Sequence, residues 1–494
     1  MTSLSNDRDP VRESPIRFVL FVDGLLLLGL AMVMILPMAV DMAHGSSEWR
    51  AFGSSIMVTG FAGGLLALIN RGYRPAMNQR AGYLLTVSAW LFVGTFGTLP
   101  LFLSVEGFSF TDAYFEALSA LTTTGSTIIE DLDLLSPGML LWRSLLQWIG
   151  GIGIVVMAIV LLPALRVGGM QLFRAESSDI SNKPVARLTN MAGLIAIVYL
   201  SLSALCAIAY AFAGMDGFDA INHAMTTIAT GGFSTRDASI GHYDSVAIEL
   251  VAIVFMTAGA LPLIMYGQIF SKGGRIFIED KQVPVFLGIL LVAIVLATMW
   301  NIGANRMEVW HALRLSAFNV TSILTDTGFA TDDFSAWGSF AVGLFFLLFL
   351  IGGCAGSTAG AMKIFRWQIL FYAVTRHLKI TISPNRVIRA RYGGRVIDAN
   401  MLSAVRNFFV LYILTLFGLS LLVMATGLDF VSSTSAIAQA MANAGPGLGP
   451  VVGPGTNFAS IPDAAKWLIV VGMIMGRLEL ITVYVLLMRD FWEQ

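Results

Sequence analysis

The sequence predicts an all-α polytopic membrane protein, with two leading helices followed by four parallel helix–pore-loop–helix repeats around one pseudo-fourfold pore. Three observations support this fold class. The chain of 494 residues is 56% hydrophobic and only 12% charged, whereas soluble proteins are nearer a quarter charged. Apolar runs of about 20 residues, the length that crosses a bilayer as a helix, recur along the chain. Four shorter apolar segments lie between these runs, and each ends in a stretch that contains glycine.

The long apolar runs predict ten membrane spans. The first run is long enough to span, so we expect the polar segment before it to be a cytosolic tail rather than part of a cleaved signal. The expected spans are 18–40, 51–69, 81–105, 139–165, 188–212, 246–270, 283–302, a stretch from 337, 401–425 and 464–488. The resulting organisation is a tail (1–17), two leading helices (18–80) and pore repeats at 81–170, 188–275, 283–380 and 401–494.

Lysine and arginine are divided unequally between two sets of connecting segments. Segments 70–80, 166–187, 271–282 and 363–398 hold 3, 4, 3 and 8 of them, and segments 106–138, 214–245, 303–336 and 426–463 hold 0, 1, 2 and 0. Because cytoplasmic loops collect positive charge, we expect both termini in the cytosol and the four glycine stretches on the outer side. The outer segments contain many acids, such as Glu106, Glu116 and Asp133, which predicts an acidic vestibule that attracts cations.

The four glycine stretches are the candidate ion-binding site. Glycine adopts positive φ without steric penalty, so a loop built on it turns several carbonyl oxygens toward an axis. Each repeat has two full spans, so the repeats share one orientation and place four such loops around that axis. Rings of carbonyl oxygen replace the water around a bare cation, and a monovalent ion is favoured because no carboxylate is required. The expected ion-contacting residues are Thr123, Thr124, Gly125, Ala229, Thr230, Gly231, Asp326, Thr327, Gly328, Asn443, Ala444 and Gly445.

Asp326 distinguishes the third stretch, because the others have Thr123, Ala229 and Asn443 at the position expected to be equivalent. Two roles are open for its side chain. It attracts ions at the mouth of the pore, or it turns away into a hydrogen bond behind the loop. The second role fits rapid ion passage better, since a carboxylate on the axis would bind ions too tightly.

A glycine-rich segment interrupts the apolar stretch 337–371 and is the first candidate for a gate. Glycine in a helix costs about 1 kcal/mol relative to alanine, so residues 352–361 are expected to form an intramembrane loop below the third glycine stretch. A kink that serves packing alone is the alternative. The expected gating residues in this segment are Gly352, Gly353, Gly356, Ser357, Thr358 and Gly360.

Arg477 is the second gate candidate because it lies inside the last apolar run. A charge at that depth costs at least ~2.5 kcal/mol and rarely persists without a role. We expect the guanidinium beneath the glycine stretches, where it repels cations and donates hydrogen bonds to loop carbonyls. A structural ion pair with an acid elsewhere in the bundle is the alternative.

The sequence resembles the TrkH/TrkG branch of the potassium transporter superfamily that also contains KtrB and the plant HKT proteins. Besides the glycine stretches, the resemblance rests on the runs 169–176, 352–360 and 476–480. It implies potassium uptake across the bacterial inner membrane by a homodimer, with a cytosolic nucleotide-binding partner ring of the TrkA type and no organic cofactor. Whether the flux is passive or a symport with protons or sodium stays open.

The resemblance also implies an ion preference. Serine at the first filter glycine goes with sodium permeation in that superfamily, and glycine at all four positions goes with potassium. The filter positions in this chain are Gly125, Gly231, Gly328 and Gly445. The chain departs from the family pattern at Asp326 and at the run 359–361, which has less glycine than expected.

Other function classes fit the sequence less well. A secondary symporter of a small solute with broken helices is the main alternative, but its repeats are usually inverted, whereas these are expected to be parallel. An intramembrane enzyme would need a constellation of acids, histidines or cysteines that the spans do not contain. The two cysteines, Cys206 and Cys354, give neither a disulfide framework nor metal-ligand spacing. A net charge of −1 gives no bulk attraction for nucleic acid, so no nucleic-acid partner is expected. Membrane lipid is the other expected partner.

Overall fold

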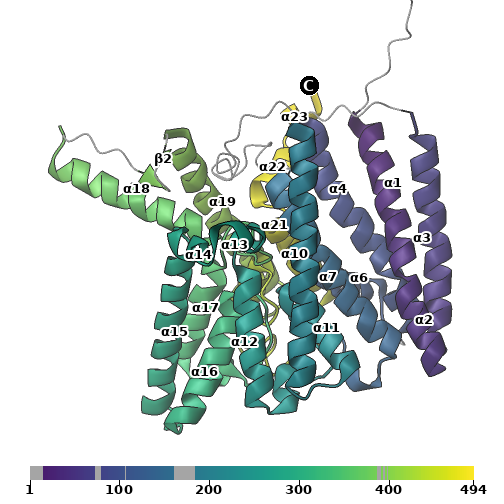
Figure 1. Cartoon of the computed structure of the whole chain (residues 1–494), viewed down its shortest axis with the longest axis horizontal. Coiled ribbons are helices and arrows are strands. Elements are labelled where there is room, and N and C mark those ends of the chain that lie inside the picture. The colour runs from purple at the N-terminus through teal and green to yellow at the C-terminus, as the bar shows by residue number, and fades with distance from the viewer. Residues whose placement is uncertain are drawn as a thin grey trace, which may run out of the picture.

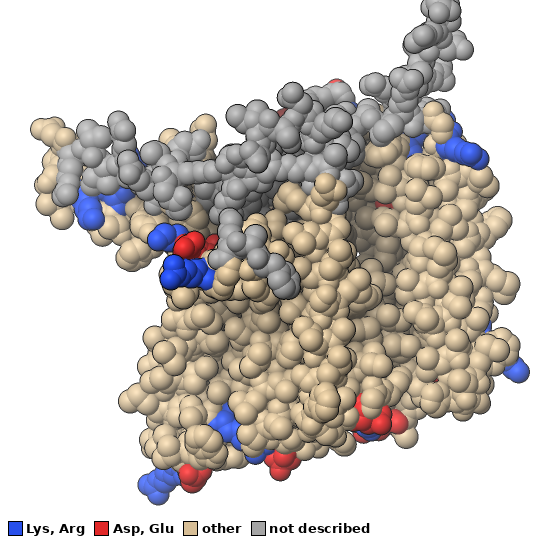
Figure 2. Space-filling model, viewed as in Figure 1, with Lys and Arg blue, Asp and Glu red and all other residues tan. Residues whose placement is uncertain are grey.

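The computed structural model describes residues 15–72, 79–105, 107–160, 184–385, 391–392, 395–397 and 399–493. Most of its helices run side by side between two ends of the molecule (Figure 1). Most of the visible charged residues lie near these two ends, and the surface between them is largely uncharged (Figure 2). Seven of the described helices are long and apolar enough to cross a membrane, and nine are if each of two bent pairs counts as one span. The chain is therefore a multi-pass membrane protein.

The leading helices form one side of the bundle. They are α1 (Pro15–Val33), α2 (Ile35–His44) and α3 (Trp49–Ile69). Helices α1 and α2 together make the first span of 30 residues. Helix α1 packs closely on α3, since a Cβ atom placed on Gly24 would lie 2.8 Å from the Gly63 carbonyl oxygen. Both leading spans lie at the edge of the molecule (Figure 1).

The rest of the chain contains four units of long and short helices. The first unit contains α4 (Gln79–Gly97), α5 (Leu99–Ser104), α6 (Phe110–Leu121) and α7 (Pro137–Val160). The second contains α10 (Pro184–Phe212), α11 (Gly217–Ile228), α12 (Val246–Ala260) and α13 (Leu263–Lys272), followed by α14 (Arg275–Glu279). The third contains α15 (Val283–Gly303), α16 (Val309–Leu324), α17 (Ser339–Ile351) and α18 (Ile364–Ile382). The fourth contains α19 (Ala399–Met424), α20 (Phe430–Ala442), α21 (Asp463–Arg477), α22 (Leu480–Leu487) and the terminal α23 (Arg489–Glu493).

Small elements complete the described chain. Three 3-10 helices follow α6, α11 and α16: η1 (Leu132–Leu134), η2 (Ser239–Tyr243) and η3 (Phe334–Trp337). A two-residue antiparallel pair, β1 (Arg391–Tyr392) and β2 (Arg395–Val396), precedes α19.

Four short helices, α6, α11, α16 and α20, begin at side-chain caps. Ser109 and Asp112 form a reciprocal capping box at α6, and single carboxylates cap the others at Asp216, Glu308 and Asp429. Such caps satisfy the first free backbone amides and fix where each helix starts. The residues toward the C-terminal end of each helix are buried, so all four helices end inside the protein.

Two of the expected straight spans are broken. The expected span 246–270 bends by 98° between α12 and α13, and the expected span 464–488 bends by 111° between α21 and α22. Leu261 is extended because Pro262 follows it, and a residue before proline avoids helical geometry. The second bend lies at Glu479, which has φ of 61°. In the third unit, α17 ends at Ile351 and no helix resumes until α18.

Some expected features lie outside the described residues. They include the tail up to residue 14, the run 169–176, and the acid at Glu106.

Candidate functional site

The chain that follows each short helix has the same backbone geometry in all four units. The amides of Thr124, Gly231, Thr327 and Ala444 each donate to a carbonyl five residues earlier, at 2.8–3.0 Å. The residue before each amide is left-handed: Thr123, Thr230, Asp326 and Asn443 have φ between 49° and 60°. The residue after each amide is a glycine with φ between 73° and 88°, namely Gly125, Gly232, Gly328 and Gly445. This hydrogen-bond pattern is the Schellman motif, which ends a helix at a left-handed residue.

The backbone corrects the alignment of the second stretch by one residue. The pattern of the four stretches in the sequence pairs Gly231 with Gly125, Gly328 and Gly445. In the structure, however, the glycine of the second stretch with positive φ is Gly232. Gly231 occupies the position of Thr124 instead, because its amide bonds to the Thr226 carbonyl at 2.9 Å. Thr230, and not Ala229, therefore stands opposite Asp326. Two consecutive glycines leave this register open in the sequence, and the helix-ending hydrogen bond fixes it.

The four stretches contact one another in cyclic order. A Cβ atom added to Gly125 would overlap the Gly231 carbonyl oxygen, and one added to Gly232 would overlap that of Thr327. One added to Gly328 would lie 2.5 Å from the Ala444 oxygen, and one on Gly445 would lie 3.1 Å from the Thr124 oxygen. Each stretch thus abuts the next, and the fourth abuts the first. We call this closed set of stretches (123–125, 230–232, 326–328 and 443–445) the glycine ring.

Four carbonyl oxygens of the glycine ring are buried and lack a protein donor. They belong to the left-handed residues Thr123, Thr230, Asp326 and Asn443, whose exposed fractions are at most 1%. Within the part of the chain that the structure describes, none of these four oxygens accepts a hydrogen bond. Each follows the C-terminal end of a short helix, which carries partial negative charge. Unpaired buried carbonyls are costly, so each of these oxygens favours a cation or water as its partner.

Other oxygens of the glycine ring are fixed by side chains. The Gly231 carbonyl accepts from Gln147 Nε2 at 2.7 Å, and the Gly445 carbonyl accepts from Ser126 Oγ at 2.7 Å. Thr124 Oγ1 accepts from Asn443 Nδ2 at 2.9 Å, which ties the first stretch to the fourth. A cavity of about 90 Å³, the outer cavity, opens on the side of the ring that is expected to face outward and is lined by all four positive-φ glycines.

Of the two roles expected for Asp326, the structure does not place its side chain at the mouth, and the carboxylate turns away behind the stretch. Its carboxylate is fully buried and does not line the outer cavity, so it is not an acid at the mouth. It faces loop 352–361, because its Oδ2 would lie 3.1 Å from a Cβ atom on Gly352. The Gly360 amide approaches the carboxylate, but neither carboxylate oxygen has a partner with hydrogen-bond geometry among the described residues. Lys363 and Arg477 are the cations that act on it electrostatically.

Loop 352–361 lies against the C-terminal ends of two short helices, α11 and α20. Thr358 Oγ1 donates to the Ile228 carbonyl at the end of α11 at 2.9 Å. The Ala361 amide donates to the Ala442 carbonyl at the end of α20 at 3.0 Å, and the Cys354 amide donates to Ala260 of α12 at 3.0 Å. Lys363 Nζ donates to the Ala359 carbonyl. The segment is thus a non-helical loop held by specific hydrogen bonds rather than a simple kink in one helix.

Arg477 lies next to this loop and is 3% exposed. Its Nη1 donates to the Thr358 carbonyl at 3.0 Å, and its Nη2 donates to Gly150 of α7 at 3.4 Å. Among the described residues no carboxylate lies within ion-pair distance of it. Glu479 pairs instead with Arg366, at 2.6 Å. A cavity of about 30 Å³ lies between the loop and Arg477 and is lined by Ser357 and Gly360 among others.

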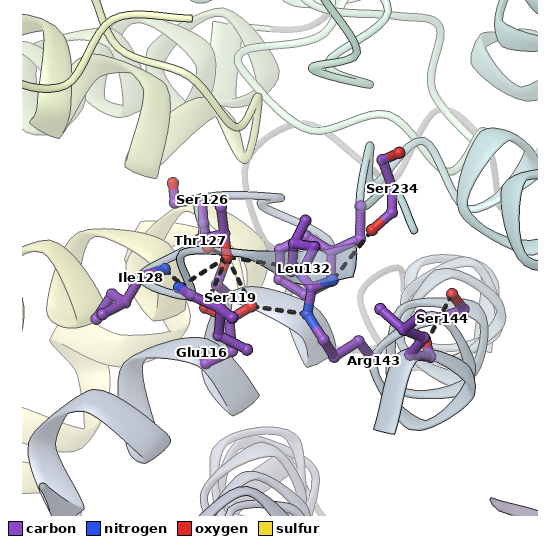
Figure 3. A network of polar contacts seen from close by, with 12 residues as sticks. Glu116, Ser119, Ser126, Thr127, Ile128, Leu132, Arg143, Ser144 and Ser234 are labelled. Carbon is purple, nitrogen blue, oxygen red and sulfur yellow. Dashed lines mark hydrogen bonds and ion pairs between the residues drawn. The ribbon is translucent and has the colours of Figure 1, made fainter. Parts of the chain in front are cut away.

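A buried polar network on α6 and α7 was not predicted from the sequence (Figure 3). Arg143 Nε donates to Glu116 Oε1 at 2.9 Å, and both side chains are almost fully buried. Gln147, one turn further along α7, contacts the second stretch. The available signal was the charge of Arg143 inside the expected span 139–165, since ionisable residues at membrane depth are rarely incidental.

Some acids of the segments expected to face outward form ion pairs, and others, such as Glu130 and Asp237, form none among the described residues. Asp112 pairs with Lys466 at 2.6 Å, and Asp133 pairs with Arg236 at 2.8 Å. Arg236 also pairs with Asp219. Burial raises the pKa of Asp219, but hydrogen bonds from Tyr243, Thr235 and Arg236 outweigh burial and leave the pKa below its ordinary value. These three carboxylates balance nearby cations, and the acidic vestibule stays a prediction for the unpaired acids.

Comparison with known proteins identifies the family. The family model TrkH, described as a cation transport protein, matches residues 50–493. The chain belongs to the TrkH family. The Trk system potassium uptake protein TrkI of Halomonas elongata is 42% identical over 485 residues, which cover 98% of each chain. TrkH of Escherichia coli is 36% identical and covers 97% of this chain and 99% of its own.

The structural comparison supports the same assignment. The crystal structure of the potassium transporter TrkH from Vibrio parahaemolyticus matches with a TM-score of 0.89 at 36% identity, over 97% of this chain and 99% of that one. The predicted family and the predicted all-α polytopic membrane fold are confirmed. The TrkH relatives are named as uptake proteins, so this chain is a transport protein and not an enzyme.

Proposed function

We propose that this chain takes up potassium across the bacterial inner membrane and that the glycine ring is its selectivity filter. The observation that carries the proposal is the set of four buried carbonyl oxygens, at Thr123, Thr230, Asp326 and Asn443, that lack protein donors within the described chain. Carbonyl rings replace the hydration shell of a permeating ion. Potassium is the ion named for the relatives, including TrkI of Halomonas elongata.

The ion path continues to a gate on the inner side of the glycine ring. Loop 352–361 is attached to the ends of α11 and α20, and Arg477 donates to this loop at Thr358. A guanidinium without a carboxylate partner, as found here in the described residues, opposes the passage of a cation. We propose that displacement of the loop together with Arg477 opens the path. Gly352, Gly353 and Gly356 give the loop the backbone freedom that such a movement needs.

The chain acts with partners in this proposal. The relatives are named as proteins of the Trk system, and the family resemblance implies a homodimer, with both termini of each chain in the cytosol, and a nucleotide-binding ring of the TrkA type. Helix α18 extends away from the bundle (Figure 1) and exposes Phe371, Leu378 and Ile382. It offers a surface for membrane lipid or for a second protein. Chemical cross-linking in native membranes, followed by mass measurement of the products, tests the dimer.

The proposal is tested by cation flux into liposomes that contain only the purified chain, with potassium, rubidium, sodium and lithium compared. Faster uptake of potassium and rubidium than of sodium and lithium is expected. Equal uptake of all four ions would contradict the filter assignment. If no cation enters, the assay is repeated with the TrkA-type partner and nucleotide, and continued absence of flux would contradict the proposal. Cation uptake that requires a small organic solute would favour a symporter instead.

A further inference from the structure

Three short helices hold the outgoing chain by a side chain at the same position. In each of these helices, the side chain lies three residues before the carbonyl that accepts the helix-ending hydrogen bond. The residues are Glu116, His223 and Asn319, and the accepting carbonyls belong to Ser119, Thr226 and Ser322. Glu116 accepts from Thr127 Oγ1 at 3.0 Å and from the Ile128 amide at 2.8 Å. His223 Nε2 lies 2.9 Å from Ser234 Oγ. Asn319 bonds the Thr331 hydroxyl at 2.9 Å and the Thr331 amide at 3.2 Å. These tethers fix the chain just after the first three stretches of the glycine ring.

The first tether differs because it is charged and has a partner on α7 (Figure 3). Arg143 donates to Glu116 through Nε at 2.9 Å and to Thr127 Oγ1 through Nη2 at 3.2 Å. Its Nη1 donates to the Ser234 carbonyl at 3.1 Å. Thr127 follows the first stretch and Ser234 follows the second, so one guanidinium joins the exits of two neighbouring stretches.

A second contact on α7 reinforces this bridge. The guanidinium of Arg143 lies 4.1 Å from the ring centroid of Phe233. One turn later, Gln147 donates to the Gly231 carbonyl at 2.7 Å and accepts from the Phe233 amide at 3.1 Å. These two hydrogen bonds of Gln147 hold the second stretch on both sides of Gly232. Gly231 is also the residue that contacts Gly125 of the first stretch.

We propose that Arg143, oriented by Glu116, is a positioning residue that sets the spacing of the first two stretches and thereby the discrimination of potassium from sodium. This inference rests on the proposed function of the glycine ring as the filter. Arginine suits the role because its planar fork donates in three fixed directions, whereas lysine carries the same charge at a single point. A buried ion pair is often no more stable than a hydrophobic replacement, so its presence is weak evidence for a role in stability alone.

The test compares Arg143→Lys with a matched control, Arg314→Lys. Arg314 pairs with Glu249 at 2.8 Å and with Asp244, and it does not line the outer cavity of the ring. Rubidium and sodium uptake are measured in liposomes, with the amount of folded protein measured by size-exclusion chromatography. Arg143→Lys is expected to lower the rubidium-to-sodium ratio about threefold or more, which corresponds to roughly 0.6 kcal/mol. Arg314→Lys is expected to keep the wild-type ratio.

A change in folded amount alone, without a change in the ratio, would mean that Arg143 is only structural and would overturn the proposal. If Arg143→Lys does not fold, Thr127→Val removes the hydroxyl that both Glu116 and Arg143 contact. A lowered ratio in Thr127→Val supports the proposal, and a wild-type ratio overturns it. A wild-type chain that does not prefer rubidium over sodium would instead overturn the proposed function, and this inference with it.

Discussion

Replacement of Gly125 by serine tests the filter assignment at one of its two most crowded contacts. Gly125 has φ of 85°, and a left-handed backbone costs a residue with a side chain about 1–2 kcal/mol. The added Cβ atom would overlap the Gly231 carbonyl oxygen. That oxygen cannot retreat freely, because Gln147 holds it at 2.7 Å. The first and second stretches must therefore move apart, which widens one side of the ring.

The expected result of Gly125→Ser is a loss of selectivity rather than a loss of flux. A change of about 1.4 kcal/mol in the relative stabilisation of two ions alters their ratio tenfold, and we expect the potassium-to-sodium uptake ratio to fall by about this factor. The assay is paired rubidium and sodium uptake into liposomes, normalised to folded protein. An unchanged ratio in folded Gly125→Ser would refute the reasoning.

Two further substitutions separate backbone strain from crowding. Gly107 also has positive φ, 80°, but a Cβ atom there would meet nothing within 4 Å. Gly107→Ser therefore carries a similar backbone cost and is expected to leave the ratio unchanged. Gly445 is intermediate, because its added Cβ atom would lie 3.1 Å from the Thr124 oxygen. Gly445→Ser is expected to lower the ratio less than Gly125→Ser.

Three other predictions concern the gate and its supports. Arg477→Ala is expected to raise potassium flux, because a positive barrier is removed; lower flux at normal expression would indicate a structural role. Thr358→Val removes one hydroxyl donor that the Ile228 and Gly259 carbonyls share, a hydrogen bond worth about 0.5–1.5 kcal/mol. It is expected to increase basal flux without changing the ion ratio, and an altered ratio would show that the loop shapes the filter. Glu479→Gln breaks the buried pair with Arg366 and is expected to destabilise the protein by about 3–5 kcal/mol. Thermal unfolding in detergent measures this loss, and an unchanged midpoint would contradict it.

Hydropathy and length were sufficient to predict the helical fold, because a bilayer imposes both on a spanning helix. The short helix before Gly125 was also visible, since its apolar run stops well below spanning length. The bend after Leu261 had a local signal in Pro262. The bend at Glu479 had none, because it accompanies an ion pair with Arg366, which lies 113 residues earlier.

The glycine ring was visible as a pattern but not in its register. Gly231 and Gly232 are adjacent, and only the hydrogen bond from Gly231 to Thr226 decides which of them takes positive φ. The ion pair between Arg143 and Glu116 was not predicted from the sequence, although both are charged residues in apolar segments. Their partnership depends on the packing of α6 against α7, which no sequence spacing reveals. Asp326 was noticed for its charge, but its contact with loop 352–361 depends on tertiary structure alone.

The most direct test of the central claim is to locate the permeating ion. Crystals of the chain grown in rubidium give anomalous scattering that marks each bound ion. The account predicts a peak enclosed by the carbonyl oxygens of Thr123, Thr230, Asp326 and Asn443, and no such peak from crystals grown in sodium. Rubidium peaks that lie elsewhere in the protein, with none inside the glycine ring, would contradict the claim that this ring is the filter.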